Sequence, residues 1–151
     1  LAGKIEHVGA HLLGRKAFGQ LASFWPTASG PVAKSMNEIP KFAFSRNGFD
    51  PSQVTTAKGW TDATVITGNL AEGITTLKKQ SGKDLLAHGG VEFAQSLIQT
   101  GLVDEFWLAT HPIAAGKGYG LFEKLETPLY LKLIETKAFS SGAMMNIYQP
   151  E

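Results

Sequence analysis

Three short segments of the chain could together bind a phosphorylated ligand, and each of them follows a predicted strand. Residues 14–16 (Gly-Arg-Lys) and 45–47 (Ser-Arg-Asn) offer cations together with hydroxyl or amide donors. Residues 88–90 (His-Gly-Gly) precede a predicted helix, whose first backbone N–H groups are free to bind an anion. Because ligands of α/β sheets bind outside the carboxyl ends of the strands, the three segments predict a site for a diphosphate and one further phosphate, as in a phosphorylated dinucleotide.

Each of these signals also has an ordinary structural explanation. A Gly-Gly pair after a strand is a common turn, so only the three segments together favour the phosphate site. His88 either contacts a ligand or is a polar residue at the rim of the sheet, and the sequence leaves both open. His7 and His11 have a spacing suited to metal ligands on one helix face, but Gly9 lies between them and no acidic partner stands out, so no metal site is predicted.

Residues 84–112 form the best-defined unit and predict a strand, a helix and a second strand. Residues 85–87 are an apolar run typical of a strand covered on both faces. The predicted helix has an apolar stripe of Val91, Ala94, Leu97 and Ile98, opposite a polar stripe of Glu92, Gln95, Ser96 and Gln99. Gly101 is placed to end this helix in a left-handed conformation, and residues 106–109 supply the second strand.

The rest of the first two thirds of the chain contains weaker patterns of the same kind. Short apolar runs predict strands at residues 10–13, 41–45, 53–56 and 64–67. One helix is predicted to end at Pro26, and another begins after Asn69, which can cap it opposite Glu72. Residues 26–40 are rich in Pro, Gly, Ser and Thr and predict a loop.

Strands and helices alternate along the first 112 residues, and two strands at 129–136 and 143–149 follow. The alternation predicts an α/β domain with a mainly parallel sheet, and the final pair predicts an antiparallel hairpin at the edge of that sheet. Neither a repeat nor a linker divides the sequence, so residues 1–151 are expected to form a single domain.

Composition and motifs exclude several classes of function. The net charge is +1 and no basic run occurs, which argues against nucleic-acid binding. No apolar stretch approaches membrane-spanning length, which argues against a membrane protein. The absence of cysteine excludes disulfide and thiolate chemistry and fits a reducing compartment such as the cytoplasm. The sequence also lacks a P-loop, a Gly-x-Ser-x-Gly elbow and the Gly-x-Gly-x-x-Gly spacing of a Rossmann fingerprint.

Six motifs occur in a characteristic order: LLGRK at 12–16, IPKFAFSRN at 39–47, GGVEF at 89–93, LVDEFWLATHP at 102–112, and shorter ones at 116–122 and 139–142. This order resembles the dihydrofolate-reductase-like superfamily, especially the branch related to the reductase domain of bacterial riboflavin biosynthesis (RibD C-terminal-like). The resemblance covers nearly the whole chain. It implies a three-layer α/β fold, in which a mainly parallel mixed sheet carries helices on both faces and an antiparallel C-terminal hairpin.

The resemblance also implies an activity, the transfer of a hydride from NADPH to a pterin- or pyrimidine-like heterocycle. The residues implied near the cofactor phosphates are Gly14, Arg15, Lys16 and Ala17. Those implied beside the adenosine 2′-phosphate are Ser45 and Arg46. The residues implied to line the pyrophosphate and nicotinamide ribose are Gly89, Gly90, Val91, Glu92 and Phe93, with His88 as a further candidate contact. Thr110 is the one residue implied on the substrate side, and no catalytic proton donor is identified.

The sequence departs from the family pattern in two places. Ala17 stands where the family often has threonine, which removes one hydroxyl donor to phosphate. The family's first strand and most of its first helix have no counterpart, so the domain is expected to be incomplete at its N-terminus and to lack a wall of the substrate pocket. A second hypothesis follows, a non-catalytic nucleotide-binding or oligomer-forming module. Its exposed strand edges would be covered in a symmetric homo-oligomer, most simply a homodimer.

Overall fold

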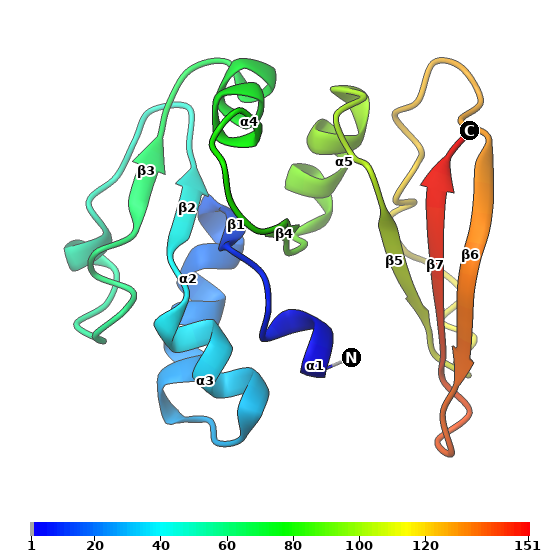
Figure 1. Ribbon diagram of the computed structural model, residues 1–151, viewed down its shortest axis with the longest axis horizontal. Helices are drawn as coiled ribbons and strands as arrows, with labels where there is room; N and C mark the ends of the chain where they lie inside the picture. The colour runs from blue at the N-terminus through cyan, green and yellow to red at the C-terminus, as the bar shows by residue number, and fades with distance from the viewer. Residues whose placement is uncertain (1) are drawn as a thin grey trace.

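The strands form two separate sheets, as Figure 1 shows for the computed structural model, which describes residues 2–151. The first sheet is parallel, has the order β3-β2-β1-β4 and consists of β1 (Ala10–Gly14), β2 (Lys41–Phe44), β3 (Thr64–Ile66) and β4 (Leu85–Ala87). The second is antiparallel, has the order β5-β7-β6 and consists of β5 (Phe106–Thr110), β6 (Leu131–Ala138) and β7 (Met144–Pro150). The predicted α/β class and C-terminal hairpin are confirmed.

The sheet that the sequence predicts as one is divided between β4 and β5. β4 is an edge strand paired with β1, and β5 is an edge strand paired with β7. Within residues 2–151 no ladder joins the two edges, although β4 and β5 are the strands by which the two sheets approach each other in Figure 1. Helix α5 (Val91–Gln99) connects them. The predicted strand–helix–strand segment therefore forms, but its two strands do not pair.

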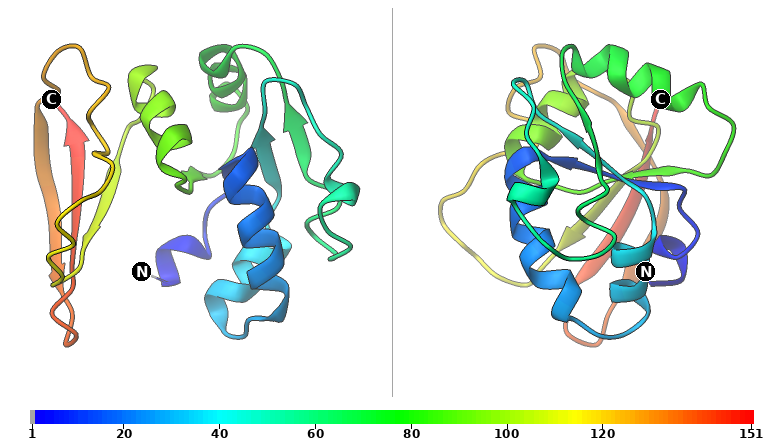
Figure 2. Two further views of the ribbon diagram at one scale, coloured as in Figure 1. Left: turned by 180° about the vertical axis from the view of Figure 1, so that it is seen from behind. Right: turned by 90° about the vertical axis from the view of Figure 1, so that its left-hand side faces the viewer.

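Helices cover both faces of the parallel sheet (Figure 2). Helices α2 (Arg15–Phe24) and α3 (Pro31–Glu38) lie on one side, and α4 (Leu70–Lys78) and α5 lie on the other. Leu12 and Leu13 of β1 point to opposite faces because side chains alternate along a strand. Leu13 packs in a core with Phe18, Ala22, Met36, Ala43 and Trp60. Leu12 packs in a second core with Ile74, Leu77 and Leu97. None of the helices in residues 2–151 is long and apolar enough to cross a bilayer.

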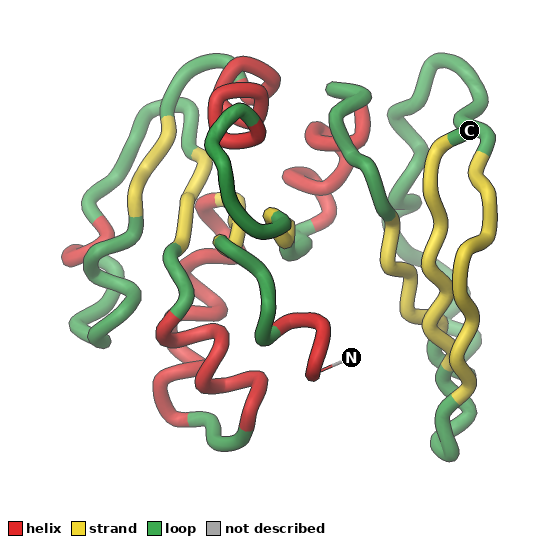
Figure 3. Tube along the Cα trace, viewed as in Figure 1, coloured by secondary structure: helices red, strands yellow, loops and turns green. Residues whose placement is uncertain are grey.

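One predicted loop and one predicted strand are wrong, and Figure 3 shows the secondary structure that is present. The loop predicted over residues 26–40 contains α3. Gly30 has a positive φ of 103°, and Pro31 opens the helix, a position that suits proline because its missing N–H would have no partner there. The strand predicted over residues 53–56 is replaced by the 3₁₀ helix η2 (Pro51–Gln53) and a turn. The other short helices are α1 (Ala2–Ile5) and η1 (Trp25–Thr27).

The predicted cap of α4 is present, but the polar stripe predicted for α5 is interrupted. Asn69 Oδ1 accepts a hydrogen bond from Glu72 N at 3.0 Å. Gln95, predicted on the polar stripe, is buried, and its Nε2 donates to Gly120 O at 2.8 Å and to Glu123 Oε1 at 2.9 Å. The loop that follows β5 therefore folds back over α5, an interaction that no local pattern in the helix reveals.

Polar contacts at the periphery help to hold the antiparallel sheet against the rest of the protein. Lys4 of α1 pairs with Glu135 of β6 at 2.9 Å, and Lys78 of α4 pairs with Asp104, which precedes β5, at 2.6 Å. Both pairs are at least partly exposed, and exposed ion pairs contribute only about 0–1 kcal/mol each. These two ion pairs therefore contribute little to the attachment of the antiparallel sheet.

Candidate functional site

The carboxyl ends of β1, β2 and β4 lie side by side at one edge of the parallel sheet. In the order β2-β1-β4 these are neighbouring strands, and they all run in the same direction. The three segments that the sequence singles out follow directly upon them, at residues 14–16, 45–47 and 88–90. The structure therefore places all three at the same edge, where ligands bind in folds of this class.

The first turns of α2 and α5 are in contact at this edge. Gly14 is the N-cap residue of α2 and Gly90 that of α5, and neither helix has a side-chain cap. A Cβ added to Gly14 would lie 2.8 Å from the Cβ of Phe93, so this approach requires glycine. Phe93 also stacks on Phe44 at the end of β2, with ring centroids 5.6 Å apart. Two helix starts with free N–H groups and positive dipole ends are thus adjacent.

Three cationic side chains at this edge have no carboxylate partner among residues 2–151. They are Arg15 and Lys16 in the first turn of α2 and Arg46 after β2, and all three are exposed. The two ion pairs of the described chain use other lysines. Arg15 lies over the ring of Phe49, with its guanidinium carbon 4.3 Å from the ring centroid. Unpaired cations beside two uncapped helix starts favour an anionic ligand.

The side chains of four other predicted cofactor residues are less available for contact with phosphate than the sequence suggests. Ala17 is buried against the core, which restricts its predicted phosphate contact to the backbone. Ser45 and Val91 are half-buried. Glu92 is exposed in the first turn of α5, where its carboxylate favours the helix dipole but repels phosphate. Any phosphate contact from residues 91 and 92 must therefore come from backbone N–H groups.

The paired glycines after β4 leave the surface in front of them open. Gly89 and Gly90 are joined by a cis peptide bond. A Cβ added to either residue would meet no atom of the described chain within 4 Å. A ligand can therefore approach the backbone of this turn and the start of α5 closely.

Thr110, the predicted substrate-side residue, lies in the other sheet. It is the last residue of β5, it is exposed, and it pairs with Met144 of β7. The unpaired edges of β4 and β5 separate it from the three strand ends. The structure thus brings the predicted cofactor residues to one edge of the parallel sheet, whereas Thr110 belongs to the antiparallel sheet.

His11 is the site residue that sequence reasoning missed, because it pairs with His88 and not with His7. His11 Nδ1 and His88 Nε2 are 2.8 Å apart, and His11 Nε2 is 3.3 Å from the carbonyl oxygen of Ser35. Burial is the largest cause that lowers the pKa of both histidines to about 4. The pair spans 77 positions of sequence and forms only because β1 and β4 are neighbours. Within residues 2–151 no group of three or more metal-ligating side chains occurs.

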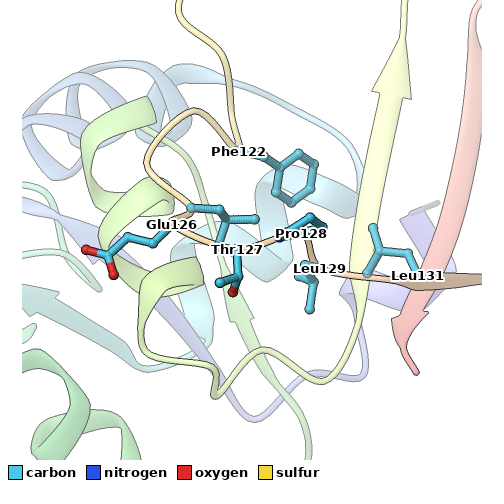
Figure 4. Close-up of a pocket in the computed structure, with 7 residues that line it drawn as sticks. Phe122, Glu126, Thr127, Pro128, Leu129 and Leu131 are labelled. Carbon is cyan, nitrogen blue, oxygen red and sulfur yellow. The ribbon is translucent and has the colours of Figure 1, made fainter.

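A pocket elsewhere in the molecule does not coincide with this edge. It has a volume of about 460 Å³ and lies against β6 (Figure 4), where it is lined by Phe122, Leu125, Glu126, Thr127, Pro128, Leu129 and Leu131. The lining contains one ionisable side chain, Glu126, and no cation, paired histidine or uncapped helix start. The polar groups that could bind a cofactor are gathered at the carboxyl edge of the parallel sheet instead.

Comparison with known proteins agrees with this arrangement. Residues 2–145 match the sequence model of the family described as RibD C-terminal domain. The uncharacterized protein YyaP of Bacillus subtilis is 32% identical over 149 residues, which cover 95% of this chain and 75% of YyaP.

Solved structures show the same fold. A Shewanella protein provisionally assigned to riboflavin biosynthesis superimposes with a TM-score of 0.78 and 23% identity, over 100% of this chain and 78% of its own. A dihydrofolate reductase from Enterococcus faecalis, solved in complex with NADP(H) and RAB-propyl, gives a TM-score of 0.62 and 14% identity, over 99% and 79% of the two chains. Identities this low show a shared fold alone, and that fold is the dihydrofolate-reductase-like one that the motif order implies.

Proposed function

We propose a function from one established premise, namely that the chain belongs to the RibD C-terminal domain family. On this premise we infer that the protein is an oxidoreductase that uses NADPH to reduce a flat heterocycle of the pterin or pyrimidine type. One observation carries the inference: the uncapped starts of α2 and α5 are in contact at the carboxyl edge of the parallel sheet, beside unpaired cations. The Enterococcus reductase of the same fold supports it, because that protein was solved with NADP(H).

The residues at the edge fit the charges of NADPH. The diphosphate would lie at the two helix starts, where Gly89 and Gly90 allow close approach of the backbone. Arg15 and Lys16 would supply positive charge to it, and Arg46 would bind the 2′-phosphate. The bound nicotinamide would supply the hydride, and the protein residues would bind and orient it. Equilibrium titration of the 151-residue chain with NADPH tests the proposal, and a protein that binds no NADPH would disprove it.

Replacing Arg46 by alanine is expected to weaken the binding of NADPH while leaving that of NADH unchanged. A hydrogen bond between charged groups contributes about 1.5–3 kcal/mol, so at this exposed position we expect a loss of about tenfold for NADPH. Competitive titrations of both cofactors at one ionic strength measure the difference. Lys132→Ala on the exposed strand β6 removes the same charge from the other sheet and serves as the control. Equal losses for NADPH and NADH would remove Arg46 from the 2′-phosphate role.

A second function is favoured by the break between the sheets. Within the described residues no ladder joins β4 to β5, and Thr110 lies in a different sheet from the cofactor-side residues. We therefore also propose that residues 1–151 form one domain, and that it works as a homodimer in the cytoplasm. In this alternative the module binds a nucleotide or another copy of itself without catalysis.

Light scattering and turnover assays separate the two functions. The homodimer is expected to have twice the 16.2 kDa mass of one chain, and a monomer at micromolar concentration would contradict it. Oxidation of NADPH that depends on an added pterin or pyrimidine would rule out the non-catalytic alternative.

A further inference from the structure

His88 lies at the candidate site, but the proposed binding of NADPH gives it no role. It follows β4 and directly precedes Gly89, and its backbone N–H donates to the carbonyl oxygen of Leu12 at 2.9 Å. Its ring is partly exposed, whereas its partner His11 is completely buried. The hydrogen bond between the two rings therefore connects the interior of the sheet to the edge where the ligand would bind.

The third partner of the pair determines where its protons lie. His11 Nε2 is hydrogen-bonded to the Ser35 carbonyl oxygen, which can only accept, so this nitrogen carries the hydrogen. Burial lowers the pKa of both rings to about 4, so each is neutral at pH 7 and carries one N–H. His11 Nδ1 must then accept, and His88 Nε2 must donate to it. By elimination, Nδ1 of His88 has a free lone pair.

This nitrogen is not fully buried. No residue of the described chain is hydrogen-bonded to Nδ1 of His88, and Trp25 Nε1 is the one buried side-chain nitrogen or oxygen in residues 2–151 that has no partner. Nδ1 is therefore not sealed inside the protein. The neighbouring Gly89 and Gly90 have no side chains to cover it.

The free lone pair on His88 Nδ1 also determines which kind of ligand group this nitrogen can bind. A neutral imidazole nitrogen without hydrogen repels the oxygens of a phosphate and attracts an N–H or O–H donor. His88 therefore differs from Gly89 and Gly90, whose N–H groups suit an anion. The sequence leaves open whether His88 contacts a ligand, and this proton arrangement favours contact with an N–H or O–H group over contact with a phosphate oxygen.

We propose that His88 is a specificity-determining residue of the site: its Nδ1 accepts a hydrogen bond from an N–H group of the bound heterocycle, and His11 is the positioning residue that fixes this tautomer. The inference rests on the proposed function for the kind of ligand, a neutral pterin or pyrimidine with ring N–H or amino donors. The tautomer itself is a property of the protein without any ligand.

The tautomer is tested by two-bond ¹H–¹⁵N NMR of the 151-residue chain labelled at histidine, at pH 7. We expect Nε2 of His88 to be protonated and its Nδ1 to be bare. His11→Leu removes the acceptor and should release His88 into a mixture of tautomers. His11→Asn places an amide oxygen near the position of Nδ1 and should restore the single form. A hydrogen on Nδ1 of His88 in the unmodified protein, or no change in His11→Leu, would overturn the proposal.

The contact with a ligand is tested by binding of folic acid, a pterin probe, and of NADPH and inorganic diphosphate as phosphate probes. His88→Phe keeps a flat ring without the acceptor. It should weaken the binding of folic acid by about two- to tenfold, which is the contribution of one hydrogen bond. His88→Asn, with an amide oxygen near the place of Nδ1, should restore part of the loss. The affinities for diphosphate and NADPH should change by less than about twofold, since neither ligand needs this hydrogen bond.

The outcomes of this experiment separate the inference from the proposed function. If His88→Phe weakened the binding of folic acid and of NADPH equally, the specificity role would be overturned. Unchanged binding of folic acid would overturn it as well. An unmodified protein that binds NADPH but no pterin or pyrimidine probe would overturn the ligand contact while leaving the cofactor assignment standing. Failure to bind NADPH would instead disprove the proposed function, and the NMR spectrum would still decide the tautomer. Urea unfolding of each variant checks that it is folded.

Discussion

Between pH 7 and pH 5 the protein is expected to lose about 2 kcal/mol of its free energy of unfolding because of the buried pair His11 and His88. The pKa of each ring falls from the ordinary 6.5 to about 4 in the folded state, mainly through burial. In this pH window the unfolded chain therefore binds more protons than the folded protein, and stability falls as the pH falls. One ring alone would cost about 2 kcal/mol at pH 5, and we expect about the same for the pair because solvent screens the partly exposed ring and the two rings interact.

Urea unfolding at pH 7, 6 and 5 measures this effect. Above pH 5 the carboxylates whose pKa is lowered in the folded protein, those of Asp50 and Glu135, stay ionised in both states and contribute little to the slope. The double variant His11→Gln with His88→Gln should show a flatter pH profile. His111→Gln, a change at an exposed residue after β5, should keep the slope of the original protein. A protein whose stability is the same at pH 7 and pH 5 would contradict the prediction.

Replacing Gly59 by alanine is expected to destabilise the protein by about 3–5 kcal/mol, which is at the upper end for a single substitution. Gly59 has a positive φ of 81°, and an added Cβ would lie 1.9 Å from the carbonyl oxygen of Asn37. The Asn37 side chain accepts a hydrogen bond from Trp60 Nε1 at 2.7 Å and donates to the Trp25 carbonyl oxygen at 3.0 Å. Because Trp60 is fully buried in the core on the α2 and α3 side, displacing Asn37 disturbs that core as well.

Gly68→Ala provides the matched control for this substitution. Gly68 has a similar φ of 86°, but a Cβ there would meet no atom within 4 Å. It should therefore cost only the backbone strain of a left-handed residue, about 1 kcal/mol. At roughly 2–4 °C per kcal/mol for a chain of this size, the two variants should differ by about 5–15 °C in Tm. Equal losses would show that the Asn37 contact does not determine the cost.

The parts of the fold that sequence predicts correctly are those determined by neighbouring residues. The apolar runs at β1 and β2 are recognisable because residues on both faces of these strands pack in the two cores, and those at β3 and β4 are partly buried. The cap at Asn69 is also determined locally, since its partner is three residues away. The failure at α3 is also local: Gly30 and Pro31 are typical of loops, but they equally open a helix, and composition alone does not separate the two.

The parts that sequence does not predict depend on contacts between distant segments. The hydrogen bond between His11 and His88 needs the pairing of β1 with β4, and the burial of Gln95 needs the loop that folds back from β5. For the candidate site, sequence predicts that the three segments follow strands, but not the tight approach of Gly14 to Phe93 that joins two helix starts. The position of Thr110 relative to β4 likewise depends on the relation between the two sheets.

The unpaired edges of β4 and β5 have a consequence for the order in which the protein exchanges its amide hydrogens. Nearly every residue of β6 is exposed, and both hydrophobic cores belong to the parallel sheet. We therefore expect the antiparallel sheet to open at a lower free energy than the parallel sheet, and its amides to exchange before those of β1 and β2. Since Thr110 belongs to the antiparallel sheet and Arg46 follows a strand of the parallel sheet, we expect salt to change the distance between these two residues, because the ion pairs that help to hold the sheets together are screened by salt.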